Sequence, residues 1–505
     1  MASPPPRPLA PHMTIRRRLL SAAALLPLSL LLGANESPPG IAPAVGSEDA
    51  GVVASSPDAG GVTVAHAGGE DAGPGAHAGG GGPLEAPGIP GADGGSDSEA
   101  VAAAAVQGGA DGGLATLVTV PGLVPPSPVP SRLTAPPITT LRTMAKSQDL
   151  LARAKLQGER LVVKEKNGEE KVLTVDPVLQ AQLTKILRDY EVPYGAAVVL
   201  EPSTGRVLAL AEHSAAQPEL RGLPFRAVFP AASIFKIVTG SALLEAGVSP
   251  EMEECFHGGK RRLTERHLED SERDGACYSL AMAMGKSANV IFAKLTQKHL
   301  TAEVLRHMAA RFRFNRAIDF VVPTDVSLAA VPEEGFALAN TGAGFGDVYL
   351  SPLHGALVAS VAANDGMWVD PVLVEPQPQP GVLLPPEEGE RVLTSEAAKA
   401  LTDMLETTVT HGTARGVFRE RHFRVDDAVG KTGTLADRNP FRDYSWFVGF
   451  APRDNPRVAV AALVVNDPKW RIRGTWLGRE AIRLGLERVP APVEVTAPAS
   501  AAGKH

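Results

Sequence analysis

The chain has 505 residues, enough for roughly two or three domains, and a formal net charge of −7 at pH 7. The negative charge comes from residues 35–131, which hold 11 acidic side chains and neither Lys nor Arg, so charge gives no support to nucleic-acid binding. Histidines occur, but none stands in a metal-ligand spacing such as His-Glu-x-x-His, and we therefore expect no metal site and no cofactor.

A mostly apolar run stands near the start of the chain. Arg16, Arg17 and Arg18 precede it, and it extends over residues 19–32. A basic segment followed by a short apolar one is typical of a secretory signal, and the run is shorter than the about 20 residues that a membrane span takes. Residues 1–34 are therefore predicted to be a signal peptide or, if uncleaved, a signal anchor.

Residues 35–145 are predicted to form a disordered acidic spacer. Gly, Ala and Pro dominate this stretch, and such a composition cannot bury enough apolar surface to offset chain entropy. Within the next segment, 146–175, Asn167-Gly168 lies between two strand-like runs, which predicts one short hairpin.

A helix and a second hairpin are predicted next. Asp176-Pro177 combines a capping side chain with a proline for the first helical turn, and apolar residues then recur at helical spacing. Two strands follow at 196–200 and 206–210, joined by a turn-forming segment rich in Pro, Ser and Gly. The helix is expected to pack one face on the domain.

The stretch around Ser233 and Lys236 predicts a buried helix that begins after Pro230 and ends at Gly247, and Lys236 is the only charge in its apolar part. Because an ammonium is costly to bury, Lys236 is expected to be paired or to have a lowered pKa. Ser233 lies three residues earlier on the same helix face, where the amine can take the hydroxyl proton and create a nucleophile. The alternative is an unreactive serine beside a lysine that reaches solvent.

The two cysteines, Cys255 and Cys277, lie in one irregular region of the sequence. In an exported protein such a local pair is predicted to form a disulfide. Two unpaired buried thiols are the alternative, because sequence alone does not show that the two Cα atoms approach each other.

Two later stretches interrupt helical patterns. Ser287 and Asn289 lie between helical runs at 279–284 and 290–295, where they are either helix caps or the tip of a loop that faces a cleft. Residues 342–347 are glycine-rich but precede a helix and follow no βαβ strand, so a packing turn is predicted in place of a phosphate loop.

The C-terminal part holds three strand-like runs and a closing helix. They are predicted at 428–434, 444–452, 458–465 and 477–486. With the two earlier strands they predict an α+β fold, in which a five-stranded antiparallel sheet has helices on both faces and a helical lobe beside it. The domain is expected to cover 176–488, followed by a disordered tail at 489–505.

Three short motifs stand in order along the chain: Ser233-x-x-Lys236, Ser287-x-Asn289 and Lys431-Thr432-Gly433. A strand edge with a lysine, hydroxyls and a glycine lets a ligand backbone approach and pair with the strand. With these motifs, residues 174–488 resemble the serine acyltransferases of the penicillin-binding protein and β-lactamase superfamily. The similarity includes the segments 174–180, 195–205, 229–238, 344–346, 351–353, 412–414 and 446–452.

The resemblance implies a role for each motif residue. Ser233 would attack the penultimate D-Ala carbonyl of a peptidoglycan stem peptide, forming an acyl-enzyme and releasing the terminal D-Ala. Lys236 would accept the proton of Ser233, and Ser287 would pass a proton to the leaving amine. Asn289 would hold the substrate amide and help keep Lys236 in place.

The resemblance also implies how the substrate is held. Lys431 would supply positive potential, Thr432 and Thr434 would donate hydrogen bonds to the substrate carboxylate, and Gly433 would let the substrate backbone approach. The backbone N–H groups of Ser233 and Thr434 would form the oxyanion hole, which is usually the largest electrostatic contribution in acyl transfer.

The implied function is that of a serine-type D-Ala-D-Ala transpeptidase that cross-links peptidoglycan and is acylated by β-lactam antibiotics. The implied location is the bacterial cell envelope, in the periplasm or on the outer face of the inner membrane, with the N-terminal segment as membrane anchor if it is not cleaved. A D,D-carboxypeptidase, a β-lactamase and a non-catalytic sensor of β-lactams or muropeptides are the alternatives. Ala288 departs from β-lactamases with a Glu-activated water, which usually carry Asp in the middle motif.

Overall fold

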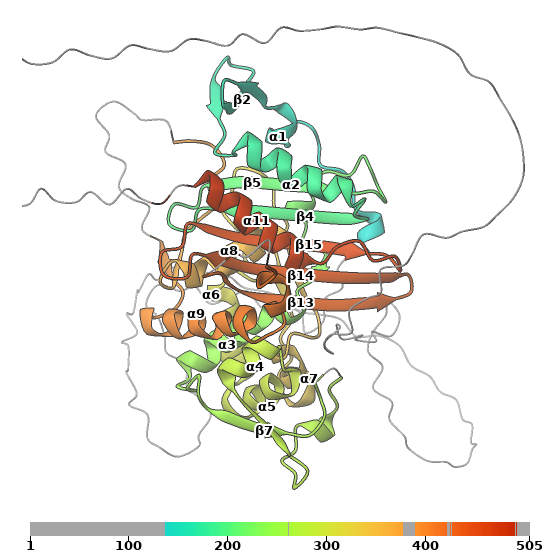
Figure 1. Ribbon diagram of the computed structural model, residues 1–505, viewed down its shortest axis with the longest axis vertical. Coiled ribbons are helices and arrows are strands. Elements are labelled where there is room, and N and C mark those ends of the chain that lie inside the picture. Colours follow the sequence, from blue (N-terminus) through green and yellow to red (C-terminus); the bar gives the residue numbers. More distant parts are fainter. Residues whose placement is uncertain are drawn as a thin grey trace, which may run out of the picture. The chain divides into compact units, whose positions relative to one another are not determined.

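The fold is organised around one central sheet (Figure 1). The computed structural model describes residues 137–489 and 491, apart from 261, 377–388, 422–424 and 426. The expected signal segment at 1–34, the expected spacer up to 136 and the expected tail from 492 onward lie outside the described residues.

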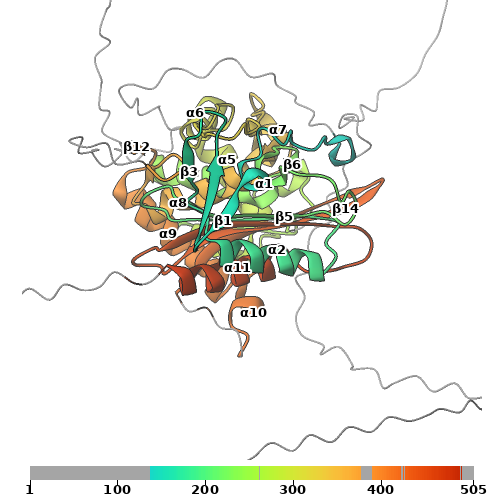
Figure 2. The same ribbon diagram turned by 90° about the horizontal axis from the view of Figure 1, so that it is seen from above.

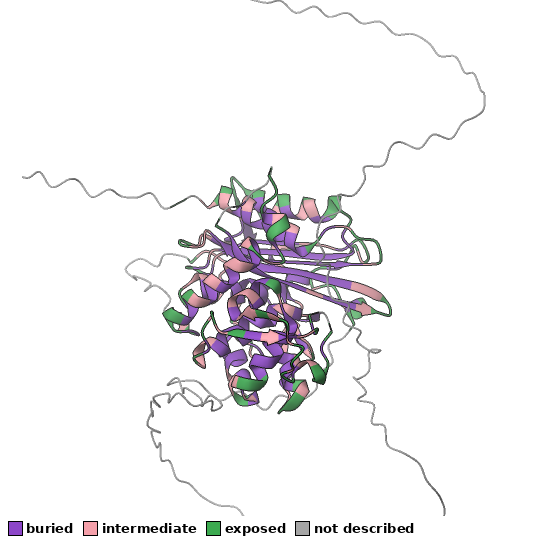
Figure 3. Ribbon diagram, turned by 60° about the horizontal axis from the view of Figure 1, so that its bottom comes forward, coloured by how far each residue is buried: buried purple, intermediate pink, exposed green. Residues whose placement is uncertain are grey.

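Five strands form the central sheet in the order β13-β14-β15-β4-β5, and each neighbouring pair is antiparallel. Their bounds are β4 Tyr194–Leu200, β5 Val207–His213, β13 Val429–Arg438, β14 Phe441–Ala451 and β15 Val458–Asn466. The middle strand, β15, is buried at every position, and the buried colour runs along most of the sheet in Figure 3. The predicted α+β fold with a five-stranded antiparallel sheet is confirmed.

Helices cover both faces of the sheet, as predicted. α2 (Pro177–Asp189) and α11 (Gly474–Arg488) lie on one face, and α8 (Pro352–Ala363) lies on the other (Figure 2). α2 buries a single stripe formed by Leu179, Leu183 and Leu187, because its other side faces solvent. α8 is buried over nearly its whole length, because it lies between the sheet and other helices.

A helical lobe lies beside β13, the edge strand of the sheet (Figure 1). Its helices are α3 Lys236–Glu245, α4 Leu280–Lys286, α5 Asn289–His299, α6 Ala302–Arg311, α7 Gly335–Gly342 and α9 Ser395–Thr410. The short helix α10 (Arg415–Phe418) contacts α9 and α11. α3 contacts α5, α6 and α9, so the lysine at its start lies inside the lobe.

The remaining elements are short. They are α1 Leu150–Arg153, β1 Lys155–Gln157, β2 Arg160–Lys164, β3 Glu170–Val172, β6 Phe229–Pro230, β7 Glu253–Phe256, β8 Ala276–Ser279, β9 Leu328–Ala329, β10 Val348–Leu350, β11 Met367–Trp368 and β12 Glu390–Arg391. Within the described part of the chain, none of the helices has both the length and the apolar character that a membrane crossing requires.

Two expectations about the N-terminal part need correction. The segment 146–175 holds three strands, β1, β2 and β3, because an added strand pairs with the predicted hairpin. The end of the expected spacer, 137–145, is in contact with the domain: Ile138 is buried, and the Met144 N–H donates to the Arg221 carbonyl at 3.1 Å. The cause is the apolar side chains of this segment, which pack against the main core.

Candidate active site

Ser233 lies in a tight turn at the start of α3. The structure places it in a 3₁₀ turn, Ala232–Phe235, and the α-helix begins only at Lys236. The prediction of a regular α-helix from residue 231 is therefore wrong for the first turn. Ala232, directly before the serine, has φ of 49°, a left-handed conformation that is costly for a residue with a Cβ. Backbone strain of this kind is concentrated at functional sites.

The Lys236 amine lies in the centre of the site and is fully buried. Its Nζ atom is 2.8 Å from Ser233 Oγ, 2.7 Å from Asn289 Oδ1 and 2.5 Å from the Ala343 carbonyl oxygen. Burial holds the pKa of Lys236 well below its ordinary value, and the nearby charge of Lys431 lowers this pKa further. A neutral amine has two N–H donors for Asn289 and Ala343, which leaves its lone pair free to accept the Ser233 proton.

Asn289 orients this amine and is itself oriented by a neighbouring loop. It is the first residue of α5, and its side chain caps no helix end, so the cap interpretation is wrong for this residue. Its Nδ2 donates to the Lys260 carbonyl at 3.0 Å. That contact fixes which end of the amide faces Lys236, because only the oxygen can accept from the amine.

Ser287 and Lys431 form a second pair of hydroxyl and amine. Ser287 ends α4 in a left-handed conformation with φ of 54°, and the Lys431 Nζ donates to its Oγ at 2.9 Å and to the Thr432 carbonyl at 3.0 Å. Lys431 is fully buried, and burial lowers its pKa to about 7. The site thus holds two buried lysines, each beside one serine.

β13 forms the wall of the site next to Ser233. The Thr432 hydroxyl lies 2.5 Å from the hydroxyl of Thr413, and Gly433 lies so close to the serine turn that an added Cβ would be 3.0 Å from Ile234 Cγ1. Thr434 is the next residue along β13 and is half-buried. Because β13 is the edge strand of the sheet, an extended peptide can pair with its free edge.

Four contacts of the site were not predicted individually: those made by Lys260, Phe292, Ala343 and Thr413. Phe292 places its ring 5.6 Å from the Lys236 Nζ, and Lys260 and Ala343 contribute only backbone carbonyls. Carbonyl contacts carry no side-chain signal in a sequence. Thr413 had a sequence signal, because it lies in the segment 412–414 that is similar to the family.

The disulfide region supports the Lys260 carbonyl. Cys255 and Cys277 are joined, as predicted, and lie opposite each other in the β7–β8 pair. The Lys260 amine lies 5.6 Å from the ring centre of Phe256 and 5.7 Å from that of Tyr278, at cation–π distance. The segment between the cysteines therefore holds the carbonyl that orients Asn289.

A buried lysine anchors the same segment to α5. Lys294 has no exposed surface, and its Nζ lies 3.0 Å from Glu254, 2.8 Å from Asp270 and 3.3 Å from Asp274. These carboxylates raise the pKa of Lys294, against the effect of burial, so this lysine stays charged. Lys236 is equally buried, but the described residues place no carboxylate beside its amine, and its pKa is lowered where that of Lys294 is raised.

Replacing Cys255 and Cys277 with serine is expected to destabilise the chain by about 3 kcal/mol, because the disulfide closes a loop with a sequence separation of 22. Acylation of Ser233 should also slow, since the Lys260 carbonyl is then less firmly held. Thermal unfolding and labelling by a fluorescent penicillin measure both effects. Adding a dithiol should lower the melting temperature and the labelling rate of the parent chain and leave both unchanged in the doubly substituted chain. An unchanged melting temperature in the double variant would contradict the prediction.

Gly344 permits close packing behind Ser233. Its φ is +90°, and an added Cβ would lie 2.5 Å from the Ala232 oxygen and 3.1 Å from Ser233 Cα. Gly344→Ala is therefore expected to cost about 1–3 kcal/mol and to slow acylation, because the serine turn must shift. Gly416→Ala is the matched control, since a Cβ there meets nothing within 4 Å. Equal melting temperatures for the two variants would refute this prediction.

Comparisons with known proteins agree with this arrangement. The family model "Penicillin binding protein transpeptidase domain" matches residues 195–475, more than half of the chain. "Peptidoglycan D,D-transpeptidase PbpA" of Mycolicibacterium smegmatis is 30% identical over 314 residues, which are 54% of this chain and 61% of that protein. "Stage V sporulation protein D" of Bacillus subtilis is 26% identical over 341 residues, 61% of this chain and 51% of that protein. The chain thus matches less than two thirds of the length of either relative.

The fold is similar to that of solved transpeptidase domains. The D,D-transpeptidase domain of a peptidoglycan glycosyltransferase from Eggerthella lenta matches with a TM-score of 0.51 and 23% identity, covering 65% of this chain and 95% of that one. PBP2 of Pseudomonas aeruginosa also matches with a TM-score of 0.51, at 23% identity, over 63% of this chain and 77% of that one. By its matching family model, the chain belongs to the penicillin-binding proteins with a transpeptidase domain.

Proposed function

We propose that this chain is a serine D,D-transpeptidase that cross-links peptidoglycan stem peptides and is acylated by β-lactams. The observation that carries the proposal is the fully buried Lys236 amine, which lies 2.8 Å from Ser233 Oγ and has a pKa well below its ordinary value. A neutral amine at that distance can accept the proton of Ser233 as its oxygen attacks a carbonyl.

In the proposed reaction, Ser233 Oγ attacks the penultimate D-Ala carbonyl while its proton passes to Lys236. The backbone N–H groups of Ser233 and Thr434 stabilise the oxyanion. When the C–N bond to the terminal D-Ala breaks, Ser287 passes a proton to the leaving amine, and Lys236 restores the proton of Ser287. An amine from a second stem peptide then attacks the ester, forms the new amide bond and returns Ser233 to its hydroxyl form.

The substrate is proposed to lie along β13. Its backbone pairs with the free edge of the strand, where Gly433 leaves room, and Asn289 holds its amide. The terminal carboxylate accepts hydrogen bonds from Thr432 and Thr434 and is attracted by the charge of Lys431. This placement is supported by the Lys431 Nζ, which lies 2.9 Å from Ser287 Oγ at the same edge.

The β-lactamase alternative receives no support from the geometry. Such an enzyme needs a base that activates the deacylating water, and among the described residues no carboxylate forms a hydrogen bond or ion pair with Ser233 or Lys236. We therefore expect a β-lactam acyl-enzyme to persist. With residues 1–34 as an export signal or membrane anchor and the acidic stretch after it as a spacer, the proposed site of action is the cell envelope.

Labelling the full chain with a fluorescent penicillin, beside Ser233→Ala, tests the proposal. We expect a covalent label that depends on Ser233 and remains while free drug persists, together with a cross-linked dimer when a stem pentapeptide is supplied. A label that is lost as the drug is consumed would favour a β-lactamase. A lasting label without any stem-peptide turnover would favour a sensor.

A further inference from the structure

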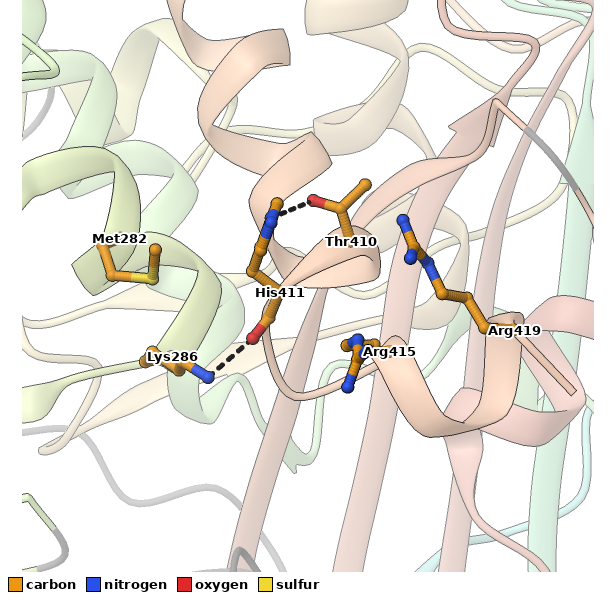
Figure 4. Close-up of a pocket in the computed structure, with 6 residues that line it drawn as sticks. All are labelled: Met282, Lys286, Thr410, His411, Arg415 and Arg419. Carbon is orange, nitrogen blue, oxygen red and sulfur yellow. Dashed lines mark hydrogen bonds between the residues drawn. The ribbon is translucent and has the colours of Figure 1, made fainter.

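Three basic side chains, those of Lys286, Arg415 and Arg419, line one pocket of the structure (Figure 4). It has a volume of about 320 Å³ and is formed by the end of α4, the end of α9 and the region of α10. Its lining residues are Met282, Lys286, Thr410, His411, Arg415 and Arg419. Concave sites of this size suit a small ligand or one end of a peptide.

Among its described lining residues, the pocket carries three cationic side chains and no carboxylate. Lys286, Arg415 and Arg419 are exposed, and within the described part of the chain none of them forms an ion pair with a carboxylate. The Lys286 Nζ donates to the His411 carbonyl at 2.6 Å, which leaves two of its hydrogens for another acceptor. Two carboxylates, Glu406 and Asp427, line the adjoining hollow, which shares Arg419 with this pocket, and Glu406 pairs with Arg453 at 3.3 Å. A concave surface with cations of one sign attracts an anion.

Two direct links join this pocket to the active site. Lys286 immediately precedes Ser287, and His411 stands two residues before Thr413, whose hydroxyl lies 2.5 Å from that of Thr432. The Thr413 N–H donates to the Gly285 carbonyl at 3.1 Å, so the two walls are also bonded to each other. The pocket therefore adjoins the side of the site where Thr432 would hold the terminal carboxylate.

That side is the one from which the second substrate must arrive. The terminal D-Ala leaves from the position next to Thr432, and the acceptor amine reaches the same acyl carbon in the reverse geometry of the leaving amine. The acceptor nitrogen forms a bond to the acyl carbon, the bond from that carbon to Ser233 Oγ breaks, and the proton of the amine passes to Oγ. From that position, the rest of the acceptor peptide would reach Thr413 first and Lys286, Arg415 and Arg419 beyond it.

We propose that this pocket binds a carboxylate of the acceptor stem peptide and so favours transfer to a peptide amine over transfer to water. The inference rests on the proposed transpeptidase function. A carboxylate suits the pocket because two arginines can each offer a planar pair of N–H donors, and the pocket continues from a peptide site. Arg415 and Arg419 are the residues that would contact the carboxylate.

The test measures how the acyl-enzyme divides between two products. The full chain is acylated with a D-Ala-ending donor peptide thioester and offered an amine-bearing acceptor peptide that ends in either a free carboxylate or an amide. Mass spectrometry gives the ratio of aminolysis to hydrolysis products. Arg415→Gln and Arg419→Gln are compared with Lys399→Gln, which removes the same charge from an exposed position on α9 that does not line the pocket.

We expect the parent chain and Lys399→Gln to prefer the carboxylate acceptor. Either arginine variant should lower the ratio about fivefold with that acceptor and leave the amide acceptor unaffected, which matches the loss of one exposed charge pair. Equal ratios for both acceptors in the parent chain would overturn the pocket assignment alone. The pocket assignment would also be overturned if Lys399→Gln lowered the ratio of aminolysis to hydrolysis as much as the arginine variants do. A parent chain that forms no acyl-enzyme on Ser233 would overturn the proposed function, and this inference with it.

Discussion

Lys236→Arg is expected to slow acylation of Ser233 by a β-lactam about a thousandfold or more, which is the range for the loss of a general base. A guanidinium stays protonated in proteins and has no lone pair to accept the serine proton. The three oxygen atoms around Nζ also leave no space for a planar group of that size, because Lys236 is fully buried.

The measurement is the rate of covalent labelling by a fluorescent penicillin in excess, with the melting temperature recorded beside it. Lys399→Arg, on the exposed side of α9, is the control for the same change of side chain. If the Lys236→Arg protein is folded and labels within tenfold of the parent rate, Lys236 is not the base. The estimate of a thousandfold would then be wrong by about 2.7 kcal/mol of barrier.

Raising the pH above about 7 is expected to slow acylation by a β-lactam that carries a free carboxylate, because burial lowers the pKa of Lys431 to about 7. Below that pH Lys431 is charged and attracts the carboxylate. Above it, the charged fraction of Lys431 falls about tenfold for each further pH unit. The rate at low drug concentration should therefore decline on the alkaline side, although neutral Lys236 is present there.

The control for this pH effect is the same β-lactam with its carboxylate esterified. The ester has no charge for Lys431 to attract, so its acylation rate should lack the decline above pH 7. Parallel alkaline declines for the acid and the ester would show that another group titrates, and the assignment of the pH effect to Lys431 would be abandoned. Lys431→Met should remove the difference between the two drugs at every pH.

Patterns with a regular period were predictable from the sequence. The alternating and continuous apolar runs of β4, β5, β13, β14 and β15 were enough to predict the sheet, and Asp176 caps α2 by accepting from the N–H groups of Val178 and Leu179. The motif residues were also brought together, as an ordered triplet of short motifs predicts. Local rules suffice for such features because they depend on neighbours in sequence.

Features that depend on contacts between distant segments were not predictable. The left-handed conformation of Ala232 is paired with the approach of Gly344, which lies far along the chain. The local pattern left Ser287 and Asn289 as either helix caps or a loop tip, and only the family resemblance placed Asn289 beside Lys236. In the structure, Ser287 accepts a hydrogen bond from Lys431 and Asn289 accepts one from Lys236. Ser287 is also the residue that ends α4, whereas Asn289 caps no helix, and the hydrogen bond of each side chain to a buried amine depends on a segment far away in the sequence.

The strand order has a consequence for how the chain becomes active. Ala196 of β4 lies opposite Leu463 of β15, so the centre of the sheet joins the two ends of the domain. Such pairing gives a high contact order, which slows folding because a long loop must close before its contacts form. The β4–β5 hairpin has no neighbouring strand until β15 has been synthesised. Assembly of the central sheet therefore has to wait until residues 458–466 have been synthesised, so the β15-facing edge of β4 stays without its partner while most of the domain is being made.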